Sequence, residues 1–376
     1  MRVIRGLLCA AFVAVASCSR DASGAAGAAG GLSDADLADE IAQRIDVREN
    51  PTVFSLFVLL NAAGYDDETS AAMHPVRRAV RTLLPRRLAD STFDRLGAFY
   101  TSHAGGADLG AYTVVAMATS GPPTFTPARV WTDSLAKLPR FRALTELPAL
   151  LRALHRVFPV DSVYRTQQLA YKAYITDYTI VMRREVAAAF RYARVRTREE
   201  LAGVGERRRV VAIPNLLMSF ERSYSFALDT THYTVEGPQA VVGFNPYEFI
   251  RAVTAPLSYD AAHYAAVQKR AAAAYTGVQR LSAMDRFATL AAYVDECLVR
   301  AIALRYRGVR DEAHRDALFA GAVSDARTGL VLVPYFFERL VKYEDQSDPL
   351  RVYYPKLFDG LDGARELARW RDSIPK

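Results

Sequence analysis

Two acidic residues, Glu248 and Glu296, stand where their neighbours could support chemistry. Each is followed one helical turn later by an arginine, Arg251 after Glu248 and Arg300 after Glu296. At the spacings i,i+3 and i,i+4, the two side chains of each pair lie on one face of a helix. Two facing carboxylates can act as a general acid and base, whereas a solvated intrahelical ion pair contributes only about 0.3 to 0.5 kcal/mol. The residue types leave both interpretations open.

The elements that must position these residues are mostly helices. Pro51 favours a helix start and Gly64 a helix stop around one strongly apolar segment. Tyrosines recur along residues 161–193 as a stripe, which is typical of a core-facing helix side. The stripe is Tyr164, Tyr171, Tyr174 and Tyr178. We expect helices at residues 51–63, 74–86, 91–103, 107–117, 132–138, 144–156, 161–193, 246–257, 260–276, 282–307, 311–324 and 332–344.

A short stretch with the composition of β-strands interrupts the predicted helices. Residues 209–213, 224–228 and 231–235 are rich in β-branched and aromatic residues and are bounded by Pro214 and by Gly237-Pro238. We therefore predict an α+β fold, predominantly α-helical, with a small β-sheet preceding the helix at 246–257. No linker-like composition follows residue 31, so the sequence predicts a single domain over residues 33–376.

Residues 246–256 also match the spacing of a known metal-binding helix. In His-Glu-x-x-His, two imidazoles one turn apart hold Zn²⁺ and the glutamate between them acts as general base. Glu248 occupies the general-base position, but Tyr247 and Arg251 occupy the two histidine positions. The segment therefore resembles the active helix of a zinc peptidase in which both histidines have been replaced.

Other segments extend the resemblance to a bacterial family of zinc-peptidase-like proteins, the domain of unknown function 4932 family. Residues 293–302 resemble the Glu-x-Leu-Val-Arg-Ala segment of that family. Further matches are residues 74–76, 213–217 with Tyr224, 340–344 and 351–357.

The resemblance implies a zincin-like fold of the gluzincin branch, with a small sheet, then the active helix, then a later helix that supplies a third ligand. It assigns Glu248 as general base and Glu296 as third zinc ligand. Tyr247 and Arg251 depart from the family, and Ala255 replaces an asparagine that the family often has before proline. Zinc is expected for the family, but an arginine cannot bind it, and one or two carboxylates hold it weakly. We expect a vestigial metal site at Tyr247, Arg251 and Glu296, with no cofactor.

Arg251 offers a second interpretation of the same site. Two carboxylates in a partly buried site need a nearby positive charge to offset their negative charges. A guanidinium in place of the metal could supply it and bridge Glu248 and Glu296. The alternative is two separate intrahelical pairs. His232 and His263 are the residues that could replace the missing zinc ligands, but neither has a second metal-binding residue at ligand spacing. We therefore expect both to be ordinary hydrogen-bonded residues.

The first residues predict export. Arg2 and Arg5 precede an apolar run at residues 7–16 that is too short to span a bilayer. The run closes at residues 15–18 with Val-Ala-Ser-Cys, which resembles the lipobox of bacterial lipoproteins. This predicts a signal peptide at 1–17, a lipid on Cys18 and a flexible tether at 18–32. The chain would be anchored in the cell envelope, on the periplasmic face and at the outer membrane if Ser19 acts as a sorting residue. An ordinary cleaved signal peptide is the alternative.

Composition disfavours two further functions, nucleic-acid binding and catalysis by a thiol. The formal net charge is +7, but the basic residues are spread along the chain and are nearly all arginine, so we expect no nucleic-acid partner. Cys9 would be removed with the signal peptide and Cys18 would carry the lipid, so Cys297 would be the one free cysteine. For Cys297, a role as a buried core residue is favoured over a role as a catalytic thiol.

We therefore expect an envelope lipoprotein with a degenerate, non-catalytic peptidase-like domain that binds a polypeptide or envelope partner. The alternatives are an active hydrolase that uses a non-standard site, and a purely structural helical lipoprotein.

Overall fold

The structure is a computed structural model that describes residues 45–65, 73–103, 109–129, 139–194, 209–220, 222–228, 231–239, 261–281 and 289–374, with the single residues 33, 36, 39, 43, 250, 284 and 287. The chain divides into two units, Met1–Gly31 and Leu32–Lys376, and the described residues all belong to the second. The predicted signal peptide, Cys18 and the tether lie outside the described residues.

Helices dominate the described residues and accompany one small mixed sheet, so the α+β prediction is confirmed at that level. The first elements are β1 (Ile45–Val47), α2 (Pro51–Ala62), α3 (Pro75–Arg87), α4 (Asp90–Ser102), α5 (Leu109–Met117), α7 (Pro139–Arg142), α8 (Leu147–Val157) and α9 (Val160–Ala193). Strands β2 (Arg209–Pro214), β3 (Ser223–Leu228) and β4 (Thr231–Glu236) follow. The last helices are α12 (Ala261–Val278), α13 (Leu290–Arg305), α14 (Glu312–Arg327), α15 (Val333–Glu344), α16 (Leu350–Leu357) and α17 (Gly363–Trp370), before a short 3-10 turn at Arg371–Ser373.

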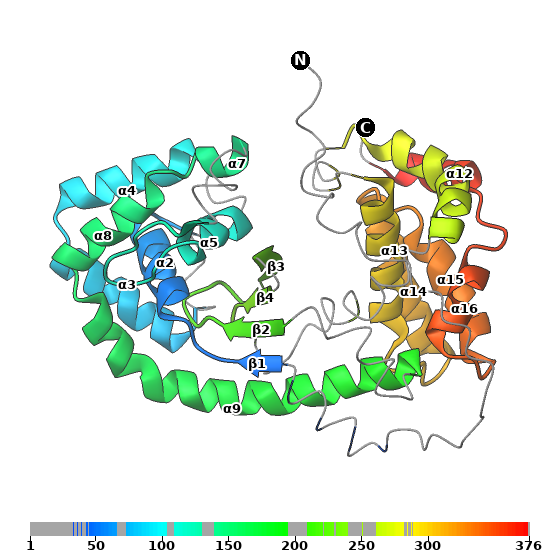
Figure 1. Ribbon diagram of the computed structural model, residues 1–376, viewed down its shortest axis with the longest axis horizontal. Helices are drawn as coiled ribbons and strands as arrows, with labels where there is room; N and C mark the ends of the chain where they lie inside the picture. The colour runs from blue at the N-terminus through cyan, green and yellow to red at the C-terminus, as the bar shows by residue number, and fades with distance from the viewer. Residues whose placement is uncertain are drawn as a thin grey trace. The chain divides into compact units, whose positions relative to one another are not determined.

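The sheet has four strands in the order β1-β2-β4-β3 (Figure 1). Strands β1, β2 and β4 are parallel to one another, and β3 runs antiparallel to β4 at the edge. In this register Val211 pairs with Tyr233, and Tyr224 pairs with Val235. The three parallel strands therefore end at the same edge of the sheet.

Strand β2 is buried on both of its faces. Successive side chains of a strand point to opposite faces, so Val210 and Ala212 face one way and Val211 and Ile213 the other. All four are buried, and the two pairs belong to two different hydrophobic cores. The unbroken apolar run of β2 is what a strand covered on both sides requires.

The amino-terminal core is the cluster built around α2 with α3, α4, α5, α8 and one face of the sheet. Asn50 caps α2 by accepting hydrogen bonds from the backbone N–H groups of Thr52 and Val53. Every residue from Val53 to Ala62 is buried, because neighbouring helices surround α2. The helix ends before Gly64, which has a φ of +89°.

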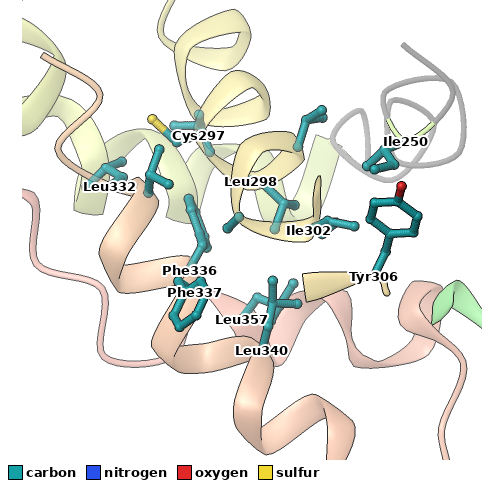
Figure 2. Close-up of a cluster of buried hydrophobic side chains, with 14 of the residues drawn as sticks. Ile250, Cys297, Leu298, Ile302, Tyr306, Leu332, Phe336, Phe337, Leu340 and Leu357 are labelled. Carbon is teal, nitrogen blue, oxygen red and sulfur yellow. The ribbon is translucent and has the colours of Figure 1, made fainter. Parts of the chain in front are cut away.

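The carboxyl-terminal core is the cluster built around α13 and α15 with α12, α14, α16 and the second half of α9. Figure 2 shows its centre, where side chains of α13 meet those of α15 and α16. Residues drawn there include Cys297, Leu298, Ile302, Phe336, Phe337, Leu340 and Leu357.

Helix α9, with 34 residues, contributes to both cores (Figure 1). Tyr171 lies in the amino-terminal core and Tyr178 in the carboxyl-terminal core, each at most 2% exposed. Tyr164 and Tyr174 are partly buried against these cores. The prediction that the tyrosine stripe packs into the core is confirmed.

Most predicted helices and strands are present with small boundary shifts, but several elements differ, among them the short unpredicted helix α7. The helix predicted at 282–307 begins at Leu290, because Thr289 caps it by accepting a hydrogen bond from the N–H of Ala292. Strand β1 and helices α16 and α17 were not predicted; Pro355 inside α16 and Gly363 at the start of α17 lower helix propensity. The predicted helices at 132–138 and 246–257 lie outside the described residues, except for Ile250.

Candidate functional site

The structure describes only part of the predicted site. Tyr247, Glu248, Arg251 and Ala255 lie outside the described residues. Ile250 is described: it is helical and 1% exposed, and it belongs to the carboxyl-terminal core. Figure 2 shows its side chain next to Tyr306, at the end of α13. Ile250 therefore packs in the same core as the helix that carries Glu296.

Glu296 lies on α13, and its side chain is buried. The residue is 5% exposed, and its Oε1 accepts a hydrogen bond of 2.9 Å from Nε of Arg300. The i,i+4 pair that the sequence allows is therefore formed. It differs from the solvated intrahelical pair that the sequence also allows, because the carboxylate of Glu296 is shielded from water.

Arg300 connects Glu296 to a second acidic residue. Its Nη1 donates a hydrogen bond of 2.6 Å to Oδ1 of Asp325 on α14. Arg300 thus lies between two carboxylates from two helices, with a side chain that is 29% exposed. Charge-assisted hydrogen bonds of this length are among the stronger polar contacts in proteins. No sequence pattern points to Asp325, because its partner lies 25 residues away on another helix.

The residues next to Glu296 fix α13 in place and do not supply a nucleophile. Tyr293 donates a hydrogen bond to the carbonyl of Gly329 and accepts one from the N–H of Val331. Cys297 is fully buried, as predicted, and burial raises the pKa of its thiol far above the ordinary value. A thiol in this environment stays protonated and inert at neutral pH.

The donor set does not fit a zinc ion. Glu296 is the one residue of the three family ligand positions that could bind zinc, and its carboxylate is already paired with Arg300. Tyr247 and Arg251 replace two imidazoles, and a guanidinium has no lone pair to give a metal. Within the described part of the chain, no three His, Cys, Asp or Glu residues cluster in a way that could hold a metal.

The histidines with described side chains make hydrogen bonds, and none of them meets another. His74 caps α3, and His103 contacts the carbonyl of Phe99. His155 contacts the hydroxyl of Ser55 at 2.9 Å. His314 accepts from the N–H of Arg310. The side chains of His232 and His263 lie outside the described residues, so their predicted roles stay predictions.

A second polar cluster lies where the parallel strands end. Asn215 follows β2, and Glu236 is the last residue of β4. Both are at most 2% exposed, and the N–H of Asn215 donates to the carbonyl of Glu236 over 2.7 Å. Helix α9 covers this edge: Tyr171 donates to Oδ1 of Asn215, and burial together with the charge of Glu236 raises the pKa of Tyr178.

This cluster sets the direction of the chain as it leaves the sheet. Tyr174 accepts a hydrogen bond from the N–H of Gln239, three residues beyond β4. A buried polar network of this kind favours one arrangement of its members. Breaking any of its hydrogen bonds leaves a buried polar group with neither a protein partner nor water. Gln239 is therefore held in one position beyond β4, and the predicted helix at 246–257 follows it in the sequence.

Arg77 anchors the same end of the sheet from α3. Its side chain is fully buried, and it donates to Oδ1 of Asn61, to the hydroxyl of Ser219 and to the carbonyl of Tyr65. Its guanidinium also lies 5.0 Å from the ring centre of Tyr65. Arg77 follows the residues 74–76 that resemble an early family motif, and the contacts give that segment a structural role.

No family model matches the chain, and no curated protein and no solved structure matches it either. None of the described helices is both long enough and apolar enough to cross a membrane.

Proposed function

We propose that this chain is an exported, lipid-anchored envelope protein whose zincin-like domain has lost its metal chemistry and binds a polypeptide or envelope partner. The lipid would be attached at Cys18, and the domain would belong with the domain of unknown function 4932 family. Glu248 would mark the former general-base position, and Glu296 the former third ligand.

The observation that carries the proposal is the pairing of Glu296. An active hydrolase that uses Glu296 as an acid or base needs its carboxylate exposed in a pocket. Here Glu296 is 5% exposed and accepts a hydrogen bond from Arg300, which also binds Asp325. This arrangement favours a structural role over catalysis at Glu296.

The order of the elements supports the zincin-like part of the proposal. Strands β2 to β4 come first, the helical residue Ile250 follows, and α13 with Glu296 comes later. Ile250 and α13 share the carboxyl-terminal core, and the side chain of Ile250 lies next to Tyr306 at the end of α13 (Figure 2), which is compatible with this order. Arg251 as a bridge between Glu248 and Glu296 remains part of the proposal, in addition to Arg300.

The experiment is a zinc-binding comparison on the purified full chain, with metal content measured after incubation with zinc and removal of excess. We expect much less than one zinc per chain in the wild type. The matched variant Tyr247→His with Arg251→His restores both imidazoles and should bind about one zinc per chain, because three protein ligands are then present.

Two results would count against the proposal. About one zinc per wild-type chain would mean that other residues complete a site, and peptidase assays would then be needed. Failure of the restored variant to bind zinc, with its fold intact by circular dichroism, would mean that residues 247 and 251 do not face Glu296. Adding Glu296→Gln to the restored variant should lower its zinc content if Glu296 is the third ligand.

A further inference from the structure

A charged depression lies between α15 and α17. It encloses about 830 Å³, and the chain around Gly360 closes one side. Its lining holds four basic and three acidic side chains. These are Arg339, Lys342, Arg365, Arg369, Glu338, Asp359 and Glu366, with Tyr335, Gly360 and Ala368 between them.

The three acidic residues of the depression are each paired within the chain. Glu338 accepts a hydrogen bond of 2.9 Å from Arg369, across from α15 to α17. Glu366, 3% exposed, accepts from Arg365 at 3.1 Å. Asp359 lies 3.9 Å from Arg270 of α12. Their negative charges are therefore already balanced, largely by Arg365 and Arg369.

Two basic residues keep an uncompensated charge. Arg339 donates to the backbone carbonyls of Lys356 and Asp359, which position the guanidinium without neutralising it. Lys342 is exposed, and among the described residues no carboxylate pairs with it or with Arg339. Since the two are three residues apart on α15, their charges project from one face of the helix.

We propose that this depression binds an acidic peptide segment, with a carboxylate of the peptide held between Arg339 and Lys342. This proposal rests on the proposed function, because it specifies the chemistry of the polypeptide partner. Arg339 and Lys342 supply the positive charge that an acidic peptide needs, because the other two basic side chains of the lining are held by Glu366 and Glu338.

The form of the site disfavours an anionic membrane. An anionic membrane surface is flat and favours several exposed basic side chains together. Here Arg365 and Arg369 are held by internal ion pairs.

The test measures fluorescence anisotropy of a labelled hexapeptide of alternating Glu and Ala with the purified full chain. The variant Arg339→Gln with Lys342→Gln should bind the peptide at least about tenfold more weakly, a difference of about 1.4 kcal/mol. The control Lys269→Gln with Arg327→Gln removes the same charge from exposed positions outside the depression and should change the affinity less than about twofold. Replacing Glu by Gln in the peptide should weaken binding to the wild type in the same way.

Lys342→Gln alone makes the test independent of folding. Lys342 makes no described hydrogen bond or ion pair, so this variant should unfold at the wild-type temperature and still lose several-fold in affinity. Equal binding of the acidic peptide by the double variant and the wild type would overturn the assignment of the depression and leave polypeptide binding standing. Binding of neither peptide by the wild type would overturn both proposals. Competition by inorganic phosphate, or binding to vesicles with anionic lipid that the double variant loses, would reassign the depression to a phosphate or a membrane and overturn the peptide proposal.

Discussion

Removing the guanidinium of Arg300 should destabilise the protein more than an ordinary surface mutation does. In Arg300→Met the buried carboxylate of Glu296 loses its 2.9 Å donor, and Asp325 loses its 2.6 Å donor. Breaking a fully buried ion pair costs about 3 to 5 kcal/mol, whereas exposed pairs contribute about 0 to 1 kcal/mol. The side chain of Glu296 is 6% exposed and that of Arg300 is 29% exposed. We therefore expect a loss of about 2 to 3 kcal/mol in the free energy of unfolding.

Urea unfolding of four proteins would measure the contribution of the pair itself. The four are the wild type, Arg300→Met, Glu296→Gln and the double variant. Since the double variant removes both charges of the Glu296 and Arg300 pair, its loss should be smaller than the sum of the two single losses by about 1 to 2 kcal/mol. Arg315→Met is the matched control, because its bridge to Glu312 is exposed at both ends and should contribute less than about 0.5 kcal/mol.

Additive losses in this double-mutant cycle would refute the reasoning. They would mean that Glu296 does not depend on Arg300 in solution, and that its burial is relieved by another group. A stabilised Arg300→Met variant would be still stronger contrary evidence, since it would show that the pair costs more to desolvate than it gains.

Two further predictions concern other parts of the carboxyl-terminal core. Burial raises the pKa of Glu185, but hydrogen bonds from Tyr306 and Arg307 hold it below the ordinary value. The stability that these hydrogen bonds give through the ionised carboxylate of Glu185 is present above its ordinary pKa. It is lost as the pH falls through the lowered pKa of the folded state. Wild type should therefore lose more unfolding free energy than Glu185→Gln between about pH 5 and about pH 3; parallel curves would contradict this. Gly363→Ala should destabilise by about 1 to 3 kcal/mol in thermal unfolding, because a Cβ there would lie 2.8 Å from the carbonyl of Arg270. Gly97→Ala, whose Cβ would meet nothing closer than 4.0 Å, should be neutral or slightly stabilising, and equal effects of the two substitutions would contradict the packing argument.

The secondary structure of the described chain was largely predictable because local signals agree with packing. Pro51 and Gly64 mark the ends of α2, and the apolar run in β2 marks a strand buried on both faces. Strand β1 was missed because three residues, Ile45–Val47, carry too short a pattern. The strand forms only because β2 offers it a parallel partner, and sequence separation hides that pairing.

The candidate site was less predictable for the same reason. The Glu296 and Arg300 pair follows from helix geometry, so the sequence could suggest it. Its burial depends on the packing of α13 against α14 and α15, and its extension to Asp325 depends on the approach of two helices. The polar cluster of Asn215 and Glu236 likewise forms only when two strands end side by side.

The sharing of β2 and α9 between the two cores has a consequence for how the chain can be divided. A fragment ending after β4 would keep Val210, Ala212 and the second half of α9, but it would lack the helices that cover them. Those apolar side chains would then form an exposed patch of the kind that promotes aggregation. A fragment beginning at α12 would lack the face that α9 supplies to the same core. Neither fragment would contain a complete interior, so proteolysis between the cores should yield insoluble pieces and not two soluble halves.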